Sequence, residues 1–138
     1  MDYYQMTSPC GIDCFNCSAY LANTNDELRA MVAKYLNIPY EQAICQGCRA
    51  EKGAPAAEGF TGTCHVYKCN EKKGISFCYE CSDFPCDYLH PYADQAAMRP
   101  HNTKVFNLGL IKKMGLEVWA KDKAKSVRKT YFKGKFKL

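Results

Sequence analysis

The stretch that decides the fold is Cys10-Gly-Ile-Asp-Cys14-Phe-Asn-Cys17. It opens a series of four short cysteine clusters, and the other three are Cys45-Gln-Gly-Cys48, Cys64-x4-Cys69 and Cys78-x2-Cys81-x4-Cys86. All ten cysteines of the 138-residue chain fall in these clusters. Buried cysteines placed at random would not form tight groups, so packing alone does not explain them. Two residues between cysteines allow both sulfurs to bind one ion, and the spacing therefore favours metal sites.

The rest of the composition predicts one domain with a small hydrophobic core. A chain of 138 residues fits a single domain. Leu, Ile, Val and Phe together number 25 residues, about 18% of the chain, whereas chains below roughly 20% begin to look disordered. Ordering each residue costs about 1–2 kcal/mol. We therefore expect cross-links to supply part of the stability.

The N-terminal sequence favours the cytoplasm, where cysteine pairs more often bind metal than form disulfides. Residues 1–20 contain neither a basic segment nor the apolar run of a secretory signal. No stretch reaches the roughly 18 apolar residues of a membrane span. We expect a soluble cytoplasmic protein whose cysteines stay reduced and available to metal.

All ten cysteines are candidate metal ligands, with zinc as the expected ion. Fifteen residues separate the second cysteine pair from the third, so these two pairs resemble a four-thiolate zinc site made of Cys45, Cys48, Cys64 and Cys69. The remaining ligand candidates form two triplets, which are Cys10, Cys14 and Cys17, and Cys78, Cys81 and Cys86. Two further sites would each need a fourth ligand, supplied by an acidic residue, by water or by one of the histidines His65, His90 and His101.

The first triplet leaves another interpretation open. The spacing of Cys10, Cys14 and Cys17 matches that of the iron–sulfur ligands of radical S-adenosylmethionine enzymes. The chain is too short for most of the barrel that such enzymes need. A simple iron–sulfur cluster, or an open-coordinate zinc site, in a redox or enzyme component remains the alternative. A C-x-x-C redox dithiol needs a βαβ context, which the sequence does not show.

Other catalytic signatures are absent from the sequence. It lacks the motifs of zinc deaminases, zinc proteases, serine hydrolases and nucleotide-binding loops. We therefore assign no catalytic residue. The sequence favours a zinc-binding interaction module, with an unknown protein partner, over an enzyme.

Helical signals begin clearly at residue 24. Thr24 and Glu27 are spaced as a capping box, and Pro39 ends the helix that follows. Its apolar stripe at helical spacing consists of Leu28, Met31, Val32, Tyr35 and Leu36. Residues 52–63 predict a surface loop, because Gly, Pro and small residues dominate them.

The later sequence predicts further short helices. A helical turn over 64–73 stops at Gly74, and two helices over 102–114 and 116–128 are separated by Gly115. Strand signals are weak throughout. The expected fold is mostly α, a small irregular metal-stabilised domain of short helices joined by cysteine-bearing loops.

Charge divides the chain near residue 103. Residues 1–103 hold 8 Lys or Arg against 12 Asp or Glu, whereas residues 104–138 hold 11 against 2. We expect a cysteine-rich metal-binding domain over 1–103. Residues 104–138 form a basic helical extension that packs on this domain or trails from it. We expect Trp119 to anchor the extension by packing.

The end of the chain suggests one more function. Residues 121–138 carry eight Lys or Arg and one Asp, interleaved with Tyr131, Phe132 and Phe136. Cations can neutralise phosphates and aromatic rings can stack on unpaired bases, so single-stranded nucleic acid is a second alternative. The other interpretation is a solvated basic helix end.

The order of these motifs resembles the cysteine-rich prokaryotic family catalogued as domain of unknown function 3795. The segments that carry the resemblance, over roughly residues 9–90, are Cys10-Gly11-Ile-Asp-Cys14-Phe-Asn-Cys17-Ser-Ala19-Tyr20, Cys45-Gln-Gly47-Cys48, Cys64-His-Val66-Tyr-Lys-Cys69, Lys73-Gly74 and Cys78-Tyr-Glu-Cys81-Ser-Asp-Phe84-Pro85-Cys86-Asp-Tyr-Leu89. The resemblance implies metal binding, with zinc expected, and no established reaction. Many members have a cysteine where this chain has Thr61, and some end in a further cysteine pair where this chain has Tyr131-Phe132-Lys133-Gly134.

Overall fold

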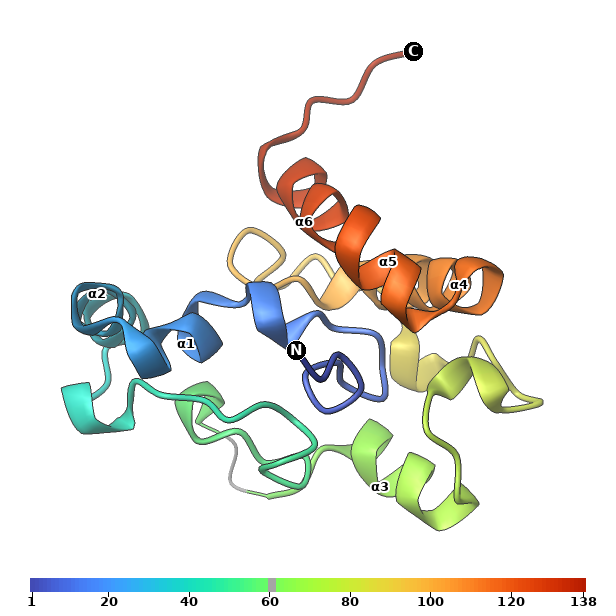
Figure 1. Ribbon diagram of the computed structural model, residues 1–138, viewed down its shortest axis with the longest axis horizontal. Helices are drawn as coiled ribbons and strands as arrows, with labels where there is room; N and C mark the ends of the chain where they lie inside the picture. Colours follow the sequence, from blue (N-terminus) through green and yellow to red (C-terminus); the bar gives the residue numbers. More distant parts are fainter. Residues whose placement is uncertain (60–61) are drawn as a thin grey trace.

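Short helices and irregular loops make up the protein, which is seen here as a computed structural model describing residues 1–59 and 62–138 (Figure 1). Its α-helices are α1 (Ser18–Leu21), α2 (Asp26–Leu36), α3 (His65–Lys73), α4 (Lys104–Met114), α5 (Leu116–Asp122) and α6 (Ala124–Lys133). Its short 3-10 helices are η1 (Cys14–Asn16), η2 (Ala22–Thr24), η3 (Tyr40–Gln42), η4 (Ala56–Glu58), η5 (Cys78–Glu80), η6 (Asp87–Leu89) and η7 (His101–Thr103). The described residues contain no strand, and Thr7 and Asp13 form one isolated bridge. The predicted mostly α, irregular fold is confirmed. Within the described residues, no helix is long and apolar enough to cross a membrane.

The N-cap of helix α2 lies one residue later than predicted. The side chain of Asn25, rather than that of Thr24, accepts a hydrogen bond from the Leu28 N–H at 2.9 Å. Thr24 instead donates its hydroxyl back to the Leu21 carbonyl. The predicted capping box is therefore wrong, because an Asn side chain caps equally well and lies at the extended position.

Only part of the predicted stripe on α2 is buried. Val32 is buried and Leu28 and Leu36 are half-buried, but Met31 is 67% exposed and Tyr35 is 61% exposed. The helix ends at Asn37 in the left-handed conformation, before Pro39, as the sequence predicts.

Of the two helices predicted near the C-terminus, the one over 102–114 is right and the one over 116–128 is wrong. Gly115 separates α4 from α5, but the expected continuous helix breaks at Lys123, with φ −123° and ψ −41°. The break lies directly before Ala124, which is buried against the body, and tertiary context of this kind commonly overrides helix propensity. In the middle of the chain, helix α3 and its end at Gly74 (φ 64°) agree with the prediction from the sequence.

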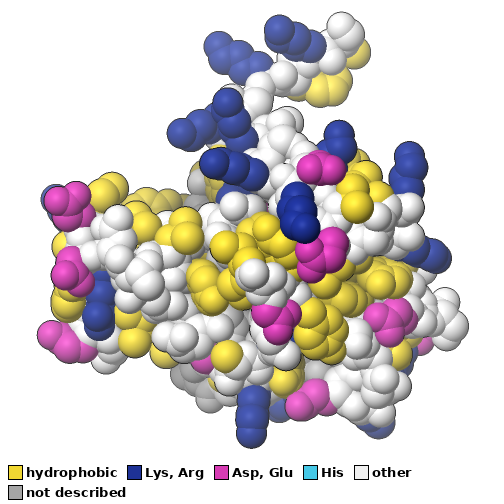
Figure 2. Space-filling model, viewed as in Figure 1, with side chains coloured by type: hydrophobic (Ala, Val, Ile, Leu, Met, Phe, Trp, Pro, Cys, Tyr) yellow, Lys and Arg dark blue, Asp and Glu magenta, His cyan; other side chains and the backbone are white. Residues whose placement is uncertain are grey.

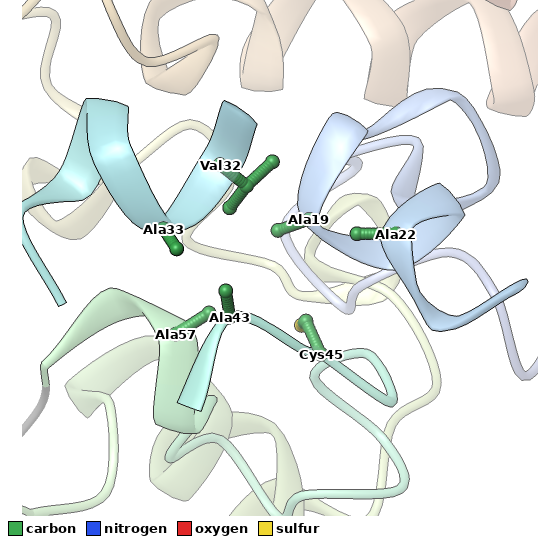
Figure 3. Packing of buried hydrophobic residues seen from close by; sticks show 7 residues of the cluster. All are labelled: Ala19, Ala22, Val32, Ala33, Ala43, Cys45 and Ala57. Carbon is green, nitrogen blue, oxygen red and sulfur yellow. The ribbon is translucent and has the colours of Figure 1, made fainter. Parts of the chain in front are cut away.

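Three small hydrophobic clusters replace a single large core. The first joins α1, α2 and the loops after them through mostly small side chains, which are Ala19, Ala22, Val32, Ala33, Ala43, Cys45 and Ala57 (Figure 3). The second surrounds Cys10, Cys78 and Leu108, and the third surrounds Phe15 and Trp119. The thin aliphatic core predicted from composition is therefore observed as small units, of which the second and third share the side chains of Tyr79 and Leu116.

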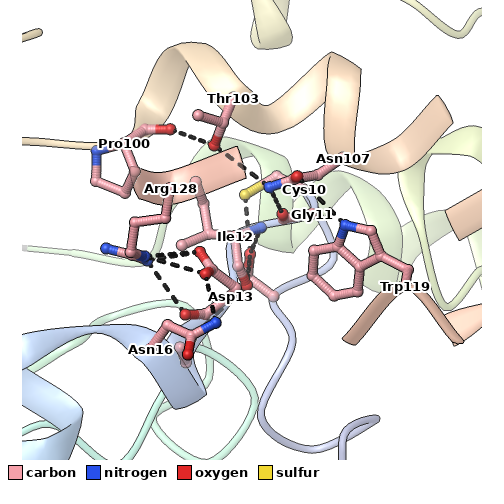
Figure 4. A network of polar contacts seen from close by, with 12 residues as sticks. Cys10, Gly11, Ile12, Asp13, Asn16, Pro100, Thr103, Asn107, Trp119 and Arg128 are labelled. Carbon is pink, nitrogen blue, oxygen red and sulfur yellow. Dashed lines mark hydrogen bonds and ion pairs between the residues drawn. The ribbon is translucent and has the colours of Figure 1, made fainter. Parts of the chain in front are cut away.

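Trp119 joins the C-terminal helices to the first cysteine segment. It is fully buried, packs edge-on against Phe15 at 5.9 Å between ring centroids, and donates its indole N–H to the Asn107 side chain at 3.3 Å (Figure 4). Asn107 in turn donates to the Gly11 carbonyl at 2.8 Å. An added Cβ at Gly11, where φ is +86°, would come within 2.9 Å of Leu108. The anchoring role expected of Trp119 is confirmed, whereas the domain division at residue 103 stays a prediction.

Candidate metal centre

Two C-x-x-C pairs that are about thirty residues apart in sequence lie together in the structure. We call these four residues, Cys14, Cys17, Cys45 and Cys48, the first cysteine group. Cys14 begins η1 and Cys17 directly precedes α1. The turn between Cys45 and Cys48 packs against them, since an added Cβ at Gly47 would lie 3.8 Å from the Cys14 Sγ. Gly47 has a φ of +88°, which an L side chain rarely adopts. The tight turn therefore brings the second pair against the first.

Backbone N–H groups point at sulfur atoms within this group. The Gly47 N–H donates to the Cys45 Sγ at 3.4 Å, and the Cys48 N–H donates to the Cys14 thiol. The Asn23 side chain holds the Cys45 backbone by accepting from its N–H at 3.2 Å and donating to its carbonyl at 2.7 Å. The hydrogen bonds from N–H groups to sulfur stabilise the thiolate form of cysteine.

Burial, with added repulsion from neighbouring thiols, raises the pKa of three thiols of this group. Burial, followed by the nearby Cys17 and Cys10, raises the pKa of Cys14 to about 11, although the Cys48 N–H opposes the rise. Burial raises the pKa of Cys45 to about 12 against the effect of the Gly47 N–H, and Glu51, followed by Cys14 and Cys17, adds to the rise. Burial also raises the pKa of Cys48, and the other thiols near it are those of Cys10, Cys14, Cys64 and Cys45. The four thiols of the two pairs thus lie close enough to repel one another when ionised.

A half-buried cation lies beside the first group. Arg128 from α6 holds the Asp13 carboxylate with contacts of 2.6–3.1 Å, and it also donates to the Asp13 carbonyl (Figure 4). The Asp13 side chain is only 2% exposed. Burial opposes the charge of Arg128, but Asp13, Cys17 and Cys14 together raise its pKa. A positive group is therefore held in place next to the first cysteine pair.

The second cysteine group lines a cavity of about 360 Å³ between α3 and the loops that follow it. Its cysteines are Cys69, Cys78, Cys81 and Cys86. The Asn70 amide donates to the Cys78 Sγ at 3.1 Å, and the Lys73 ammonium lies 2.9 Å from the Cys81 Sγ. Burial raises the pKa of Cys78 to about 11, against the effect of Asn70.

Two polar side chains of this cavity, those of Lys73 and Asn70, contact cysteine sulfurs and also have other polar features. Lys73 also forms an ion pair with Asp83 at 2.8 Å, and these two contacts, the one with Asp83 first, raise the pKa of Lys73. The Oδ1 atom of Asn70 is buried and has no hydrogen-bond partner among the described residues. An unpaired buried acceptor of this kind is uncommon in folded proteins.

Cys10 and Cys64 lie between the two groups. Cys10 is within electrostatic range of Cys48 on one side and of Cys78 on the other, and it contacts the Ser8 hydroxyl at 3.1 Å. Cys64 lies near Cys48, as the predicted four-thiolate grouping requires, but Cys69 lines the second cavity. Which cysteines share an ion stays a prediction.

Comparison with known proteins agrees with the motif order. The family described as a protein of unknown function, DUF3795, matches residues 6–91, which include all ten cysteines. The chain belongs to this family. No curated protein and no solved structure matches the chain. The resemblance seen in the sequence is therefore confirmed, and the DUF3795 match ends before α4.

The cysteines of this DUF3795 protein are suitable ligands for a soft metal, but their sulfurs do not surround a common point. All ten are free thiols. Across residues 1–59 and 62–138, no three Cys, His, Asp or Glu side chains come close enough together to hold an ion. Cysteine sulfurs that accept hydrogen bonds from N–H groups are suitable ligands for zinc. The structure assigns no coordination geometry to them.

The histidines considered as fourth ligands have other partners. His65 stacks on Tyr88 with ring centroids 6.0 Å apart. His90 contacts the Pro91 carbonyl through Nδ1 at 2.7 Å, and His101 contacts the Tyr92 carbonyl through Nε2 at 3.0 Å. Thr61, the position at which related members carry cysteine, lies outside the described residues.

Sequence reasoning missed the side chains that surround the sulfurs. Arg128, Asn70 and Asn23 carry no motif, and each reaches its cysteine segment through a tertiary contact. Lys73 was visible only as part of the Lys73-Gly74 helix end. No local signal in this DUF3795 chain would have identified the first three.

Proposed function

We propose that this protein binds zinc through cysteine thiolates and that the ion stabilises a small interaction module. One observation carries the proposal. Two C-x-x-C pairs, Cys14/Cys17 and Cys45/Cys48, pack against each other, and backbone N–H groups donate to two of their sulfurs. This is the donor arrangement that zinc knuckles use. The expected compartment is the reducing cytoplasm.

The first group, Cys14, Cys17, Cys45 and Cys48, would hold one ion, and Arg128 would offset part of its negative charge. When bound, zinc supplies a permanent cross-link between the segments that carry its ligands. Because a divalent cation favours thiolates, it reverses the effect of burial that otherwise keeps these thiols protonated.

The second group, Cys69, Cys78, Cys81 and Cys86, would hold another ion. Asn70 and Lys73 already donate to two of its sulfurs. Lys73 would balance charge here as Arg128 does in the first group. The two groups together account for eight of the ten predicted ligands, and Cys10 and Cys64 remain between them.

The energetics support a stabilising role. Structural zinc contributes about 10–16 kcal/mol to folding in zinc-finger peptides, whereas whole domains are stable by about 5–15 kcal/mol. The hydrophobic clusters of this chain are small, and the first is built mainly from alanine. An ion at either group would therefore supply a large share of the stability.

Elemental analysis of anaerobically purified protein, together with a visible spectrum, tests the proposal. We expect zinc, close to two ions per chain, and a colourless protein. Iron with acid-labile sulfide would overturn the zinc assignment in favour of an iron–sulfur cluster. A metal-free protein that is fully folded would overturn metal binding altogether.

Single substitutions then separate the two groups. We expect Cys45→Ser to lose one zinc ion and Cys78→Ser to lose the other, each with reduced helical circular dichroism. Ala50→Ser places the same new hydroxyl on an exposed residue beside the first group and should keep both ions. If Cys45→Ser retains its full zinc content, the first group is not a site.

A further inference from the structure

The outer face of α6 carries a stripe of cations. Ala124, Val127 and Tyr131 turn toward the body of the protein, where Ala124 is buried and the other two are half-buried. Lys125, Lys129 and Lys133 follow one another at four-residue spacing on the opposite side, and all three are exposed. Four residues advance a helix by about 6 Å, so the three ammonium groups form a row along the helix.

No acidic group neutralises this row. The only Asp or Glu residues after residue 103 are Glu117 and Asp122, and Glu117 pairs with Lys121 at 3.2 Å. Within the described part of the chain, no ion pair involves the three lysines of the stripe. Figure 2 shows Lys and Arg side chains gathered around the C-terminal helices and tail. The stripe therefore presents uncompensated positive charge to solvent.

A hollow of about 480 Å³ lies between α4 and α6, alongside the stripe. Ser126 and Thr130 line it, and at 100° per residue they lie next to Lys133 around the α6 axis. Phe106 of α4 forms another wall and is 61% exposed. Tyr131 also lines the hollow, and its buried hydroxyl has no hydrogen-bond partner among the described residues. An exposed ring and an unsatisfied hydroxyl thus lie next to a row of cations.

We propose that this surface binds a short single-stranded nucleic acid. Lys125, Lys129 and Lys133 contact its phosphates, and one unpaired base enters the hollow and stacks on Phe106. Stacking on an aromatic side chain needs a base that is free of a duplex, so the hollow favours a single strand. Ala124 of α6 is buried in the third cluster, and Val127 and Tyr131 are half-buried. Phe132, 36% exposed, is therefore too small an apolar face for the membrane insertion of this helix.

Fluorescence anisotropy with labelled oligouridylate and oligothymidylate of about 12 nucleotides tests the proposal. The protein is used with its natural metal content. No cysteine lines this hollow, so bound metal does not take part in the proposed contacts. We expect binding that weakens steeply between about 50 and 200 mM salt. The triple variant Lys125→Gln/Lys129→Gln/Lys133→Gln should bind at least tenfold more weakly. Its slope of log K against log salt should be shallower by about 2, since each phosphate contact on a single strand contributes about 0.7.

Two controls separate this site from general attraction to polyanions. Lys52→Gln/Lys68→Gln/Lys72→Gln removes the same charge from exposed lysines elsewhere and should change affinity less than twofold. Phe106→Ala should weaken binding several-fold with an unchanged salt slope, and Phe106→Tyr should restore it. Circular dichroism confirms that each variant is folded.

Four results would overturn the proposal. The first is equal weakening by the two lysine triples. The second is a Phe106→Ala variant that binds like the parent. The third is duplex bound as tightly as single strand. The fourth is binding to vesicles rich in phosphatidylserine with none to the oligonucleotides, which would point to a membrane instead.

Discussion

Gly47 is the residue on which contact between the two C-x-x-C pairs depends most directly. Its φ of +88° makes the turn, and the space where a Cβ would stand is bordered by the Cys14 side chain and the Tyr20 ring. Because only glycine adopts this conformation without strain, the turn sequence Cys45-Gln-Gly-Cys48 is suited to bringing its sulfurs to Cys14.

We expect Gly47→Ala to lower the free energy of unfolding by about 1–2 kcal/mol, since a left-handed alanine costs about that much. The variant should also bind zinc more weakly in a competition with a chromophoric chelator. Gly109→Ala is the matched control, because nothing lies within 4 Å of its added methyl group and it sits inside α4. That variant should be unchanged or stabilised by up to about 1 kcal/mol. Equal urea midpoints for the two variants would contradict the role given to Gly47.

An ion pair between half-buried Arg128 and buried Asp13 ties helix α6 to the first cysteine segment. Arg128 lies on the inner side of the helix and reaches Asp13, the residue before Cys14. Truncating one partner of a buried pair leaves the other charge without compensation, at a cost of about 3–5 kcal/mol. Exposed pairs contribute about 0–1 kcal/mol.

We therefore expect Arg128→Met to destabilise the protein by several kcal/mol, as read from urea unfolding, while Lys121→Met removes only the exposed pair with Glu117 and has little effect. The double variant Asp13→Asn/Arg128→Met should recover part of the loss, because it no longer buries an unpaired charge. An Arg128→Met variant as stable as Lys121→Met would show that α6 is held by packing alone.

The same elements show what could be predicted from the sequence. Helix α3 and the stop after α4 were predictable because Gly74 and Gly115 mark helix ends locally. The break at Lys123 was not, since neither Gly nor Pro marks it and the burial of Ala124 that accompanies it depends on tertiary packing. The cysteines were recognisable as ligand candidates from spacing. Their partners were not, because contact between Cys14 and Gly47 depends on tertiary packing.

Across the whole molecule, buried thiols and bound metal have opposite effects on the pH dependence of stability. In the metal-free protein, burial raises the pKa of Cys14 from 9.0 to about 11 and that of Cys45 from 9.0 to about 12. A folded-state pKa above the unfolded value means that the unfolded chain releases protons first as pH rises. The stability due to these neutral thiols is complete below about pH 9 and is lost as pH rises through 11 to 12.

Urea unfolding of the metal-free protein should therefore show a free energy of unfolding that falls between about pH 9 and pH 11, by about 2–3 kcal/mol per thiol. Cys45→Ala should flatten this fall, since the alanine has no proton to lose. Zinc reverses the sign, because bound thiolates are deprotonated in the folded state and must take up protons when the ion leaves. The loaded protein should accordingly be stable at alkaline pH and lose stability as pH falls into the acid range, with zinc release at the same midpoint. Identical pH profiles with and without zinc would contradict thiolate ligation, whatever the metal content measured at neutral pH.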